Sequence, residues 1–235
     1  MNDLTVAVSG ATGYAGGEVL RLLSTHPHLN VTTVCGHSTA GEKLGRHQPH
    51  LPRFSDLVVQ ESTAEVLAGH DVVILALPHG QSGQIAAELE STSPDTLIVD
   101  LAADHRLISA AAWEKFYGSD HQGTWTYGLP ELLTADGTKQ REALKSTKRI
   151  AVPGCNGTAV PLGLAPLIQA GLAAPAGLNA VLANGVSGAG KALKPHLTAA
   201  EVLGDASPYG TGGTHRHVPE IEQNLNGVLG ADAAD

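Results

Sequence analysis

A glycine-rich turn near the N-terminus places the strongest constraint on how this chain can fold. The turn reads Gly10-Ala11-Thr12-Gly13-Tyr14-Ala15-Gly16 and directly follows the apolar run Leu4–Ser9. Glycine permits a tight turn, and it lets a following helix and a ligand approach the backbone closely. The pattern therefore predicts a first β–α unit whose helix N-terminus can bind the pyrophosphate of a dinucleotide.

Short aliphatic runs alternate with helical stretches from this turn to Asp100. That order is typical of a parallel sheet with helices on both faces, so we predict an α/β fold with a Rossmann-type sheet. The expected strands are Leu4–Ser9, Leu29–Cys35, Leu57–Gln60, Asp71–Leu77, Thr96–Asp100, Arg149–Val152 and Leu178–Ala183. The expected helices are Gly16–Ser24, Thr63–Ala68, Gln81–Leu89, Ala111–Tyr117, Lys139–Lys145, Thr158–Ala170 and one that begins at Pro219.

Charge and hydropathy exclude several classes of partner. The 235 residues include 14 Lys and Arg against 23 Asp and Glu, which gives a net charge of -9, and no basic block interrupts the chain. We therefore expect neither nucleic acid nor a membrane surface as a partner. The longest clear apolar stretch, Val72–Leu77, is far shorter than the ~20 residues of a membrane span. The N-terminus has no signal-peptide pattern, so we expect a cytoplasmic protein.

The residues after the second expected strand indicate which dinucleotide is bound. An Asp or Glu at this point would favour a free ribose 2′-hydroxyl, but none is present. The chain instead offers Ser38 and Thr39, with Lys43 and Arg46 close behind. Hydroxyl groups and cations suit a 2′-phosphate, so we predict NADP rather than NAD. The alternative is that Ser38 and Thr39 only form a turn.

Other segments at strand ends are expected to face the same crevice, because ligands bind outside the carboxyl ends of parallel strands. These are Leu77-Pro78-His79-Gly80 and the segment Asp100–Arg106. His79 could equally be a surface turn residue. The long irregular segment 36–54 is also expected to be functional, since loops of this length usually are.

The two cysteines differ in their setting. Cys155 lies in Pro153-Gly154-Cys155-Asn156 between a strand and an apolar helix, where the helix macrodipole favours a thiolate. Cys35 lies within an apolar strand and is expected to pack as a small hydrophobe. Position alone leaves Cys155 open as either a buried free thiol or a nucleophile.

Three further segments could supply the groups that a thiolate nucleophile requires. His215 and His217 stand two apart on a stretch that we expect to be extended, so that they share a face. The segment Asn184–Lys191 offers backbone N–H groups and a cation for phosphate, and Arg106 offers a bidentate fork for an anion. Lys191 could instead be a solvated surface charge, and one histidine could be structural. No metal site is expected, because the histidines lack partners at zinc-like spacing.

Taken together, the motifs resemble the N-acetyl-gamma-glutamyl-phosphate reductase family of arginine biosynthesis. The resemblance covers nearly the whole chain. It implies an NADP-binding Rossmann domain over residues 1–152 and a partial α+β catalytic domain over residues 153–235. The motifs are Gly10–Gly17, Leu77-Pro78-His79-Gly80, Asp100–Arg106, Tyr127-Gly128-Leu129-Pro130-Glu131, Pro153-Gly154-Cys155, Ser187-Gly188-Ala189-Gly190-Lys191, His215-Arg216-His217 and Pro219-Glu220.

The resemblance also implies a reaction, NADPH-dependent reduction of the small acyl phosphate N-acetyl-L-glutamyl 5-phosphate to the 5-semialdehyde, and a homotetramer in full-length relatives. The catalytic positions are Cys155 as nucleophile and His215 or His217 as acid/base, of which we prefer His217. Substrate contacts fall on Arg106, Asn156, Lys191 and Tyr209. Cofactor contacts fall on Gly10, Thr12, Gly13, Tyr14, Ala15, Gly16, Ser38, Thr39, Leu77, Pro78, His79, Ser187 and Gly188.

The chain departs from the family pattern in three places. Gly157 follows Asn156 where the family usually has a larger residue, and it should loosen a helix by up to about 1 kcal/mol relative to Ala. His105 stands where a Phe is usual. Family chains also continue well beyond His217, so we expect a truncated chain whose catalytic domain is incomplete.

Two other functions remain open from the residues. One is an enzyme like the aspartate-semialdehyde dehydrogenases, which share the thioacyl chemistry. The other is a non-catalytic NADPH-binding module with a redox-sensitive thiol.

Overall fold

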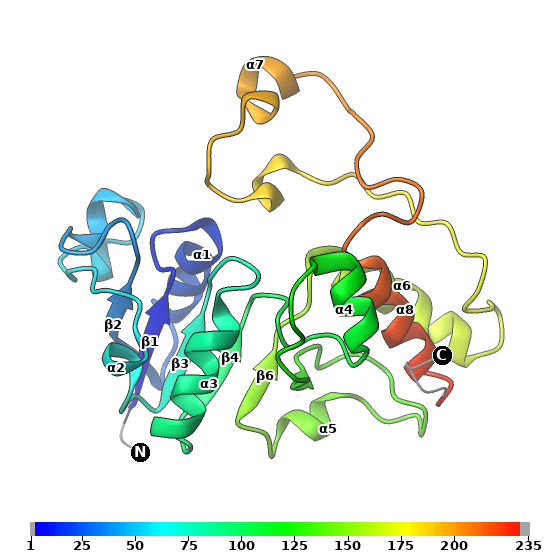
Figure 1. Cartoon of the computed structure of the whole chain (residues 1–235), viewed down its shortest axis with the longest axis horizontal. Coiled ribbons are helices and arrows are strands. Elements are labelled where there is room, and N and C mark those ends of the chain that lie inside the picture. The colour runs from blue at the N-terminus through cyan, green and yellow to red at the C-terminus, as the bar shows by residue number, and fades with distance from the viewer. Residues whose placement is uncertain (1–2, 231–235) are drawn as a thin grey trace. The chain divides into compact units, whose positions relative to one another are not determined.

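The computed structural model describes residues 3–230, and they contain a six-stranded parallel sheet (Figure 1). The strands are β1 (Leu4–Ser9), β2 (Leu29–Cys35), β3 (Val72–Leu75), β4 (Leu97–Asp100), β5 (Thr126–Tyr127) and β6 (Arg149–Ala151). They lie in the order β2-β1-β3-β4-β6-β5, and every pairing is parallel. The predicted Rossmann-type α/β sheet is confirmed, and β1 and β2 have the predicted bounds.

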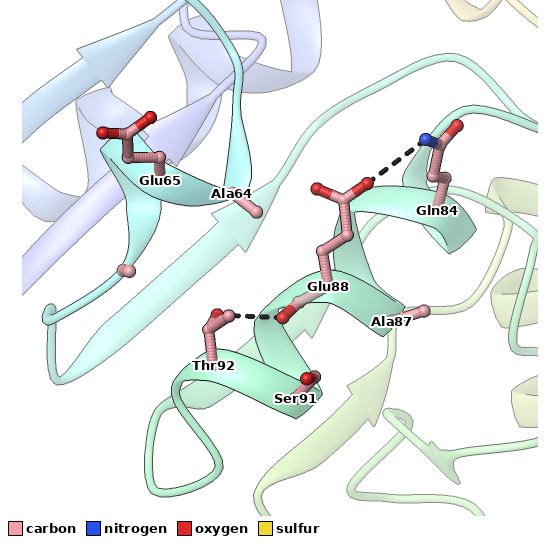
Figure 2. Close-up of a pocket in the computed structure, with 8 residues that line it drawn as sticks. Ala64, Glu65, Gln84, Ala87, Glu88, Ser91 and Thr92 are labelled. Carbon is pink, nitrogen blue, oxygen red and sulfur yellow. Dashed lines mark hydrogen bonds between the residues drawn. The ribbon is translucent and has the colours of Figure 1, made fainter.

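Alternate residues of the central strands enter two separate apolar cores, because successive strand side chains point to opposite faces. On one face, Ala7, Val73 and Leu75 pack against α2 (Ala64–Leu67) and α3 (Ser82–Thr92). An open groove runs between these two helices (Figure 2), and its walls carry Glu65, Gln84, Glu88, Ser91 and Thr92.

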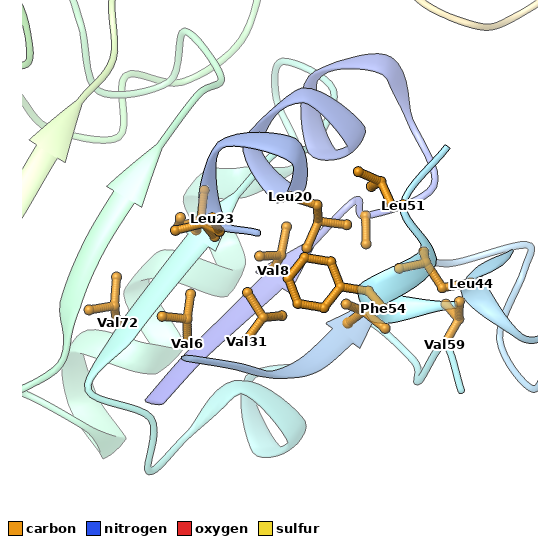
Figure 3. Close-up of a cluster of buried hydrophobic side chains, with 13 residues drawn as sticks. Val6, Val8, Leu20, Leu23, Val31, Leu44, Leu51, Phe54, Val59 and Val72 are labelled. Atoms are coloured by element: carbon orange, nitrogen blue, oxygen red, sulfur yellow. The ribbon is translucent and has the colours of Figure 1, made fainter. Parts of the chain in front are cut away.

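The other face of the sheet packs against α1 (Tyr14–Leu23) and the segment that follows β2 (Figure 3). Val6 and Val8 of β1 lie in this core with Leu20 and Leu23 of α1. The segment 36–54 contains two 3₁₀ turns, η1 (Leu44–Arg46) and η2 (Pro52–Phe54). Its side chains Leu44, Leu51 and Phe54 are buried in this core. A segment expected to be irregular is therefore part of the packing.

The side of the sheet on which successive strands are added changes between β1 and β3. The chain passes from β1 to β2 on one side and then returns to β3 on the other side of β1. This is the switch point at which open parallel sheets form a ligand crevice. The loops after β1 and β3 contain the two predicted motifs that begin at Gly10 and Leu77.

The remaining regular elements of the described chain are helices. They are α4 (Ala110–Tyr117), α5 (Arg141–Leu144), α6 (Cys155–Gln169), η3 (Val186–Ala189), η4 (Pro195–Leu197), α7 (Ala199–Val202) and α8 (Val218–Gly227). Helices α6 and α8 pack against each other, and Pro219 lies in the first turn of α8 as predicted. None of the helices within residues 3–230 has the length and apolar character needed to cross a membrane.

Two compact units divide the chain. The first includes the chain up to Arg106, Gln122–Gly128 and Ala143–Val152, and so holds the whole sheet. The second includes Leu107–His121, Leu129–Glu142 and the chain from Pro153 onward. Both this division and the predicted domains break between Val152 and Pro153, but two earlier segments pack with the second unit.

Two predicted strands are wrong, and one predicted helix is present but begins earlier than predicted. Residues 57–60 form single bridges through Val58 and Gln60 rather than a strand. Residues 178–183 form no strand, and Val181 is 94% exposed, because the described residues offer them no extended partner. The helix expected from Thr158 begins three residues earlier, at Cys155, since Gly154 serves as its N-cap.

Replacing Gly10 with alanine should destabilise the first unit more than the same change at Gly41. Both residues have positive φ, +76° and +86°, but a Cβ at Gly10 would overlap the carbonyl oxygen of Ala76, whereas a Cβ at Gly41 meets nothing within 4 Å. The conformational strain alone costs about 1–2 kcal/mol, and the overlap adds about 1–3 kcal/mol. Urea unfolding of both variants measures the difference, and equal losses would contradict the close approach.

Candidate active site

The turn after β1 has the geometry of a phosphate-binding loop. Gly10 has a φ of +76°, and a Cβ at Gly16 would overlap the carbonyl oxygen of Gly10. Gly13 is the N-cap of α1, with extended backbone and no side chain to cap the helix. Tyr14 and Ala15 are exposed in the first turn. The N–H groups of this turn and the positive end of the helix dipole suit a pyrophosphate.

The side chain of Gln48 fixes the backbone of this turn through hydrogen bonds. The sequence did not indicate this role. Nε2 of Gln48 donates to the carbonyl oxygens of Ala11 and Gly13 at 3.0 and 2.9 Å, and the residue is 6% exposed. Gly17 makes room for this amide, because a Cβ there would overlap it. A lone glutamine in a long loop carries no signal of such a contact.

The structure brings the residues after β2 to the same turn. The hydroxyl oxygens of Thr12 and Thr39 lie 3.2 Å apart, and Ser38 is exposed beside Thr39. Residues 38–41 also form a turn, so the two interpretations of these hydroxyls are compatible. Lys43, which was expected near a 2′-phosphate, pairs with Asp56 at 2.7 Å.

Hydrogen bonds from side chains to backbone join the loop after β3 to the loop after β4. Nδ1 of His79 accepts a hydrogen bond from the backbone N–H of Ala103 at 3.0 Å. Asp104, 1% exposed, accepts from the N–H groups of Gly80 and Gly83 at 2.9 and 3.2 Å. It thereby fixes the loop that contains Leu77 and Pro78. The acidic residue was visible in the sequence, but its partners depend on the register between β3 and β4.

Asp100 is buried at the end of β4. Its carboxylate accepts from the backbone N–H of Ala102 and from the hydroxyl of Ser82, both at 2.9 Å. Burial raises the pKa of Asp100 above its usual value, and the two hydrogen bonds offset this only in part.

Arg106 is buried and directed at backbone. Its Nε donates to the carbonyl oxygen of Val152 and its Nη2 to that of Leu101, both at 2.7 Å. The guanidinium therefore joins the segments that follow β4 and β6. Its contact with a substrate anion stays a prediction.

His105 fills the position of the usual Phe by stacking. Its ring lies parallel to that of Trp125, with centroids 3.8 Å apart, and Nδ1 is 3.1 Å from the carbonyl oxygen of Gly123. An aromatic packing role is retained by the imidazole.

In the second unit, Cys155 is the first residue of α6, and it is exposed. A buried carboxylate shares this helix end, because Glu220 of α8 accepts from the N–H of Gly154 at 2.8 Å and is 1% exposed. The thiol and the Glu220 carboxylate therefore share the helix end at which the macrodipole is positive. Cys35 is buried as predicted, and burial raises the pKa of its thiol to about 12.

The two histidines gather at this helix end, although they lie on turns rather than on the expected extended stretch. A Cβ at Gly154 would overlap the ring of His217. The His215 and His217 rings meet edge to face with centroids 4.7 Å apart, and Tyr209 meets His215 at 5.0 Å. Burial lowers the pKa of His215, as does the charge of Arg216, while Glu220 acts in the opposite direction.

The remaining predicted residues of this unit lie apart from regular packing. Ser187 and Gly188 belong to η3, and Lys191 follows it, all exposed. Their cofactor and substrate contacts stay predictions. The groove between α2 and α3 in Figure 2 contains none of the predicted site residues. Within residues 3–230, no group of three or more metal-ligating side chains is assembled.

Comparison with known families identifies the class of protein. The family described as semialdehyde dehydrogenase, NAD binding domain, matches residues 5–140. Its dimerisation domain matches residues 155–234. The chain belongs to the semialdehyde dehydrogenase family.

Two relatives within this family are similar to the chain over nearly its whole length. A protein of Micrococcus luteus named N-acetyl-gamma-glutamyl-phosphate reductase is 62% identical over 226 residues, which are 96% of this chain and 64% of that protein. A protein of the same name from Renibacterium salmoninarum is 56% identical over 97% of this chain and 64% of its own length. The chain thus spans a little under two thirds of the length of these relatives.

A solved structure shows the same fold. Aspartate semialdehyde dehydrogenase with NADP from Candida albicans matches with a TM-score of 0.60 at 18% identity, over 97% of this chain and 60% of that one.

Gly157 and Gly163 of α6 should respond in opposite directions to alanine. A Cβ at Gly157 would lie 2.6 Å from the Glu220 carboxylate, whereas one at Gly163 meets nothing within 4 Å. We expect Gly163→Ala to stabilise by up to about 1 kcal/mol through helix propensity, and Gly157→Ala to destabilise. Urea unfolding measures both, and a gain at Gly157 would show that Glu220 does not require the space.

The raised pKa of Asp100 predicts a pH dependence of stability. Between 3.8 and its folded pKa, the folded chain holds a proton that the unfolded chain has released, so this group's contribution to the unfolding free energy falls as pH rises. The difference in unfolding free energy between Asp100→Asn and the parent chain should therefore shift in favour of the variant as pH rises from 3.5 to 7.

Asp71 is the matched control for this experiment. Hydrogen bonds from the backbone N–H and hydroxyl of Thr5 lower its pKa, so its contribution is present above 3.8 and is lost as pH falls. Asp71→Asn should lose stability relative to the parent at pH 7 and approach it in acid. Parallel pH profiles for the two variants would contradict both assignments.

Proposed function

We propose that this chain is part of an NADPH-dependent reductase of N-acetyl-L-glutamyl 5-phosphate that acts through a thioester on Cys155. The observation that carries the proposal is the exposed thiol at the start of α6, with Asn156, His215 and His217 gathered at the same helix end. The names of the relatives from Micrococcus luteus and Renibacterium salmoninarum support the substrate.

The residues after β1 and β2 fit a dinucleotide. Gly10, Gly13 and Gly16 would hold the pyrophosphate, since side chains at the first and last would fill the space that the backbone occupies. The hydroxyls of Thr12 and Thr39, with Ser38 beside them, would hold the 2′-phosphate. This polar edge without an acidic residue supports NADP rather than NAD.

Cys155 begins the reaction in the proposed mechanism. Its thiolate attacks the acyl carbon, the C–O bond to phosphate breaks, and phosphate leaves with the bonding electron pair and takes a proton from solvent. Bound NADPH would supply the hydride that reduces the thioester carbonyl. The C–S bond then breaks, the aldehyde leaves, and an imidazolium protonates the departing sulfur.

His217 is the proposed acid/base. Its ring lies against Gly154, directly before the nucleophile, whereas Nδ1 of His215 accepts the backbone N–H of His217 at 3.0 Å. That bond occupies one nitrogen of His215 and supports a positioning role for it. Backbone N–H groups in the first turn of α6 would stabilise the oxyanion.

The other predicted residues complete the proposal. Arg106, Asn156, Lys191 and Tyr209 would contact the substrate, and Leu77, Pro78, His79, Ser187 and Gly188 the cofactor. We also propose that the protein is cytoplasmic, that it binds no nucleic acid, and that its full-length form is a homotetramer. The match to a dimerisation domain and the net charge of -9 support this.

An activity assay tests the function. The chain is given N-acetylglutamate 5-semialdehyde, phosphate and NADP, and formation of NADPH is followed by absorbance, with the Micrococcus luteus relative as positive control. Cys155→Ser should reduce turnover by at least about 10³-fold, the scale typical of a lost nucleophile. Cys35→Ser is the matched control and should retain turnover, because Cys35 lies in the sheet core.

Two results would contradict the proposal. One is turnover of aspartate semialdehyde in preference to the acetylated substrate, which would favour an aspartate-semialdehyde dehydrogenase. The other is NADPH binding without turnover of either substrate while the relative is active, which would favour a non-catalytic module.

A further inference from the structure

The amide of Asn156 lies between the proposed nucleophile, Cys155, and the proposed positioning residue, His215. Asn156 is the second residue of α6 and is 5% exposed. Its Oδ1 is 3.7 Å from Sγ of Cys155, and its Nδ2 is 3.5 Å from Nε2 of His215. One buried side chain therefore contacts both the thiol and an imidazole.

The backbone determines which nitrogen of His215 carries the proton. The N–H of His217 donates to Nδ1 of His215 at 3.0 Å. A ring nitrogen that accepts a hydrogen bond carries no hydrogen, so the proton of the neutral ring is on Nε2. The Nε2–H group then faces the NH₂ group of Asn156, and two donors oppose each other.

Reversing the amide removes this conflict. The oxygen and NH₂ ends of a side-chain amide have nearly the same shape, and hydrogen bonds decide which end faces which neighbour. We infer that Asn156 directs its oxygen to Nε2–H of His215 and its NH₂ to Cys155, so that it positions the imidazole and stabilises the thiolate. The use of this arrangement in catalysis rests on the proposed function.

The charges around Cys155 make an N–H donor useful there. The Glu220 carboxylate of α8 is bound at the N–H of Gly154, one residue before the thiol, and it disfavours a second negative charge. Arg216 lies near His215, and the His217 ring lies against Gly154. A hydrogen bond from Asn156 to sulfur favours the charged form against Glu220.

The rate of Cys155 alkylation as a function of pH tests the inference without any substrate. Asn156→Leu replaces the amide with an apolar side chain of similar size. If NH₂ faces sulfur, the midpoint of the alkylation profile should move up by roughly one pH unit. If the oxygen faces sulfur, it stabilises the neutral thiol, and the midpoint should move down, which would overturn the inference.

Asn226→Leu is the matched control. It makes the same change on α8, six residues beyond Glu220 and about 9 Å further along the helix at about 1.5 Å per residue. Its alkylation profile should match that of the parent chain. Cys35 does not interfere, because its thiol is buried within the sheet.

A second measurement needs no variant. Nitrogen-15 NMR of the histidine rings in the parent chain should show neutral His215 with its proton on Nε2, and a proton on Nδ1 would overturn the inference. Activity is read separately. If the NMR and alkylation results are as expected but the chain shows no reductase turnover, the role of Asn156 is supported and only the proposed function is contradicted.

Discussion

The backbone at the carboxyl end of β1 approaches its neighbours so closely that no side chain fits. Gly10 lies against the carbonyl of Ala76 in the loop after β3, and Gly16 of α1 lies against the carbonyl of Gly10. These two contacts bring one strand, one helix and one loop together at the switch point of the sheet. Because the crevice of a parallel sheet forms at this point, the geometry of the whole first unit depends on them.

Buried polar side chains then hold the loops that surround this point. Gln48 fixes the glycine turn through two carbonyls, and Asp104 fixes the loop after β3 through two N–H groups. Each binds backbone groups of these loops, and a backbone group that is buried without a partner is costly in a packed interior. Arg106 does the same for the carbonyls of Leu101 and Val152. Apart from the contact between Arg106 and Leu101, these side chains bind backbone groups that lie 21 to 46 residues away in the sequence.

In the second unit, side chains from α8 and the turn before it pack against the N-terminal end of α6. Gly154 and Gly157 of α6 leave space for His217 and Glu220. Gly157, which departs from the family pattern, is explained by the carboxylate that occupies the space beside it. The exposed thiol, the buried amide and the buried carboxylate of α8 thus meet at the first turn of α6.

The sequence by itself determined β1 and β2, the order of the parallel α/β unit, the buried state of Cys35 and the place of Pro219 in the first turn of α8. These depend on local patterns, namely apolar runs, glycine spacing and proline position, that act within a few residues. Only the tertiary structure decided the roles of Gln48, Asp104 and Glu220, because their partners are 21 to 66 residues away. It also decided against a strand at residues 178–183, since a strand requires a paired neighbour that an apolar pattern alone cannot supply.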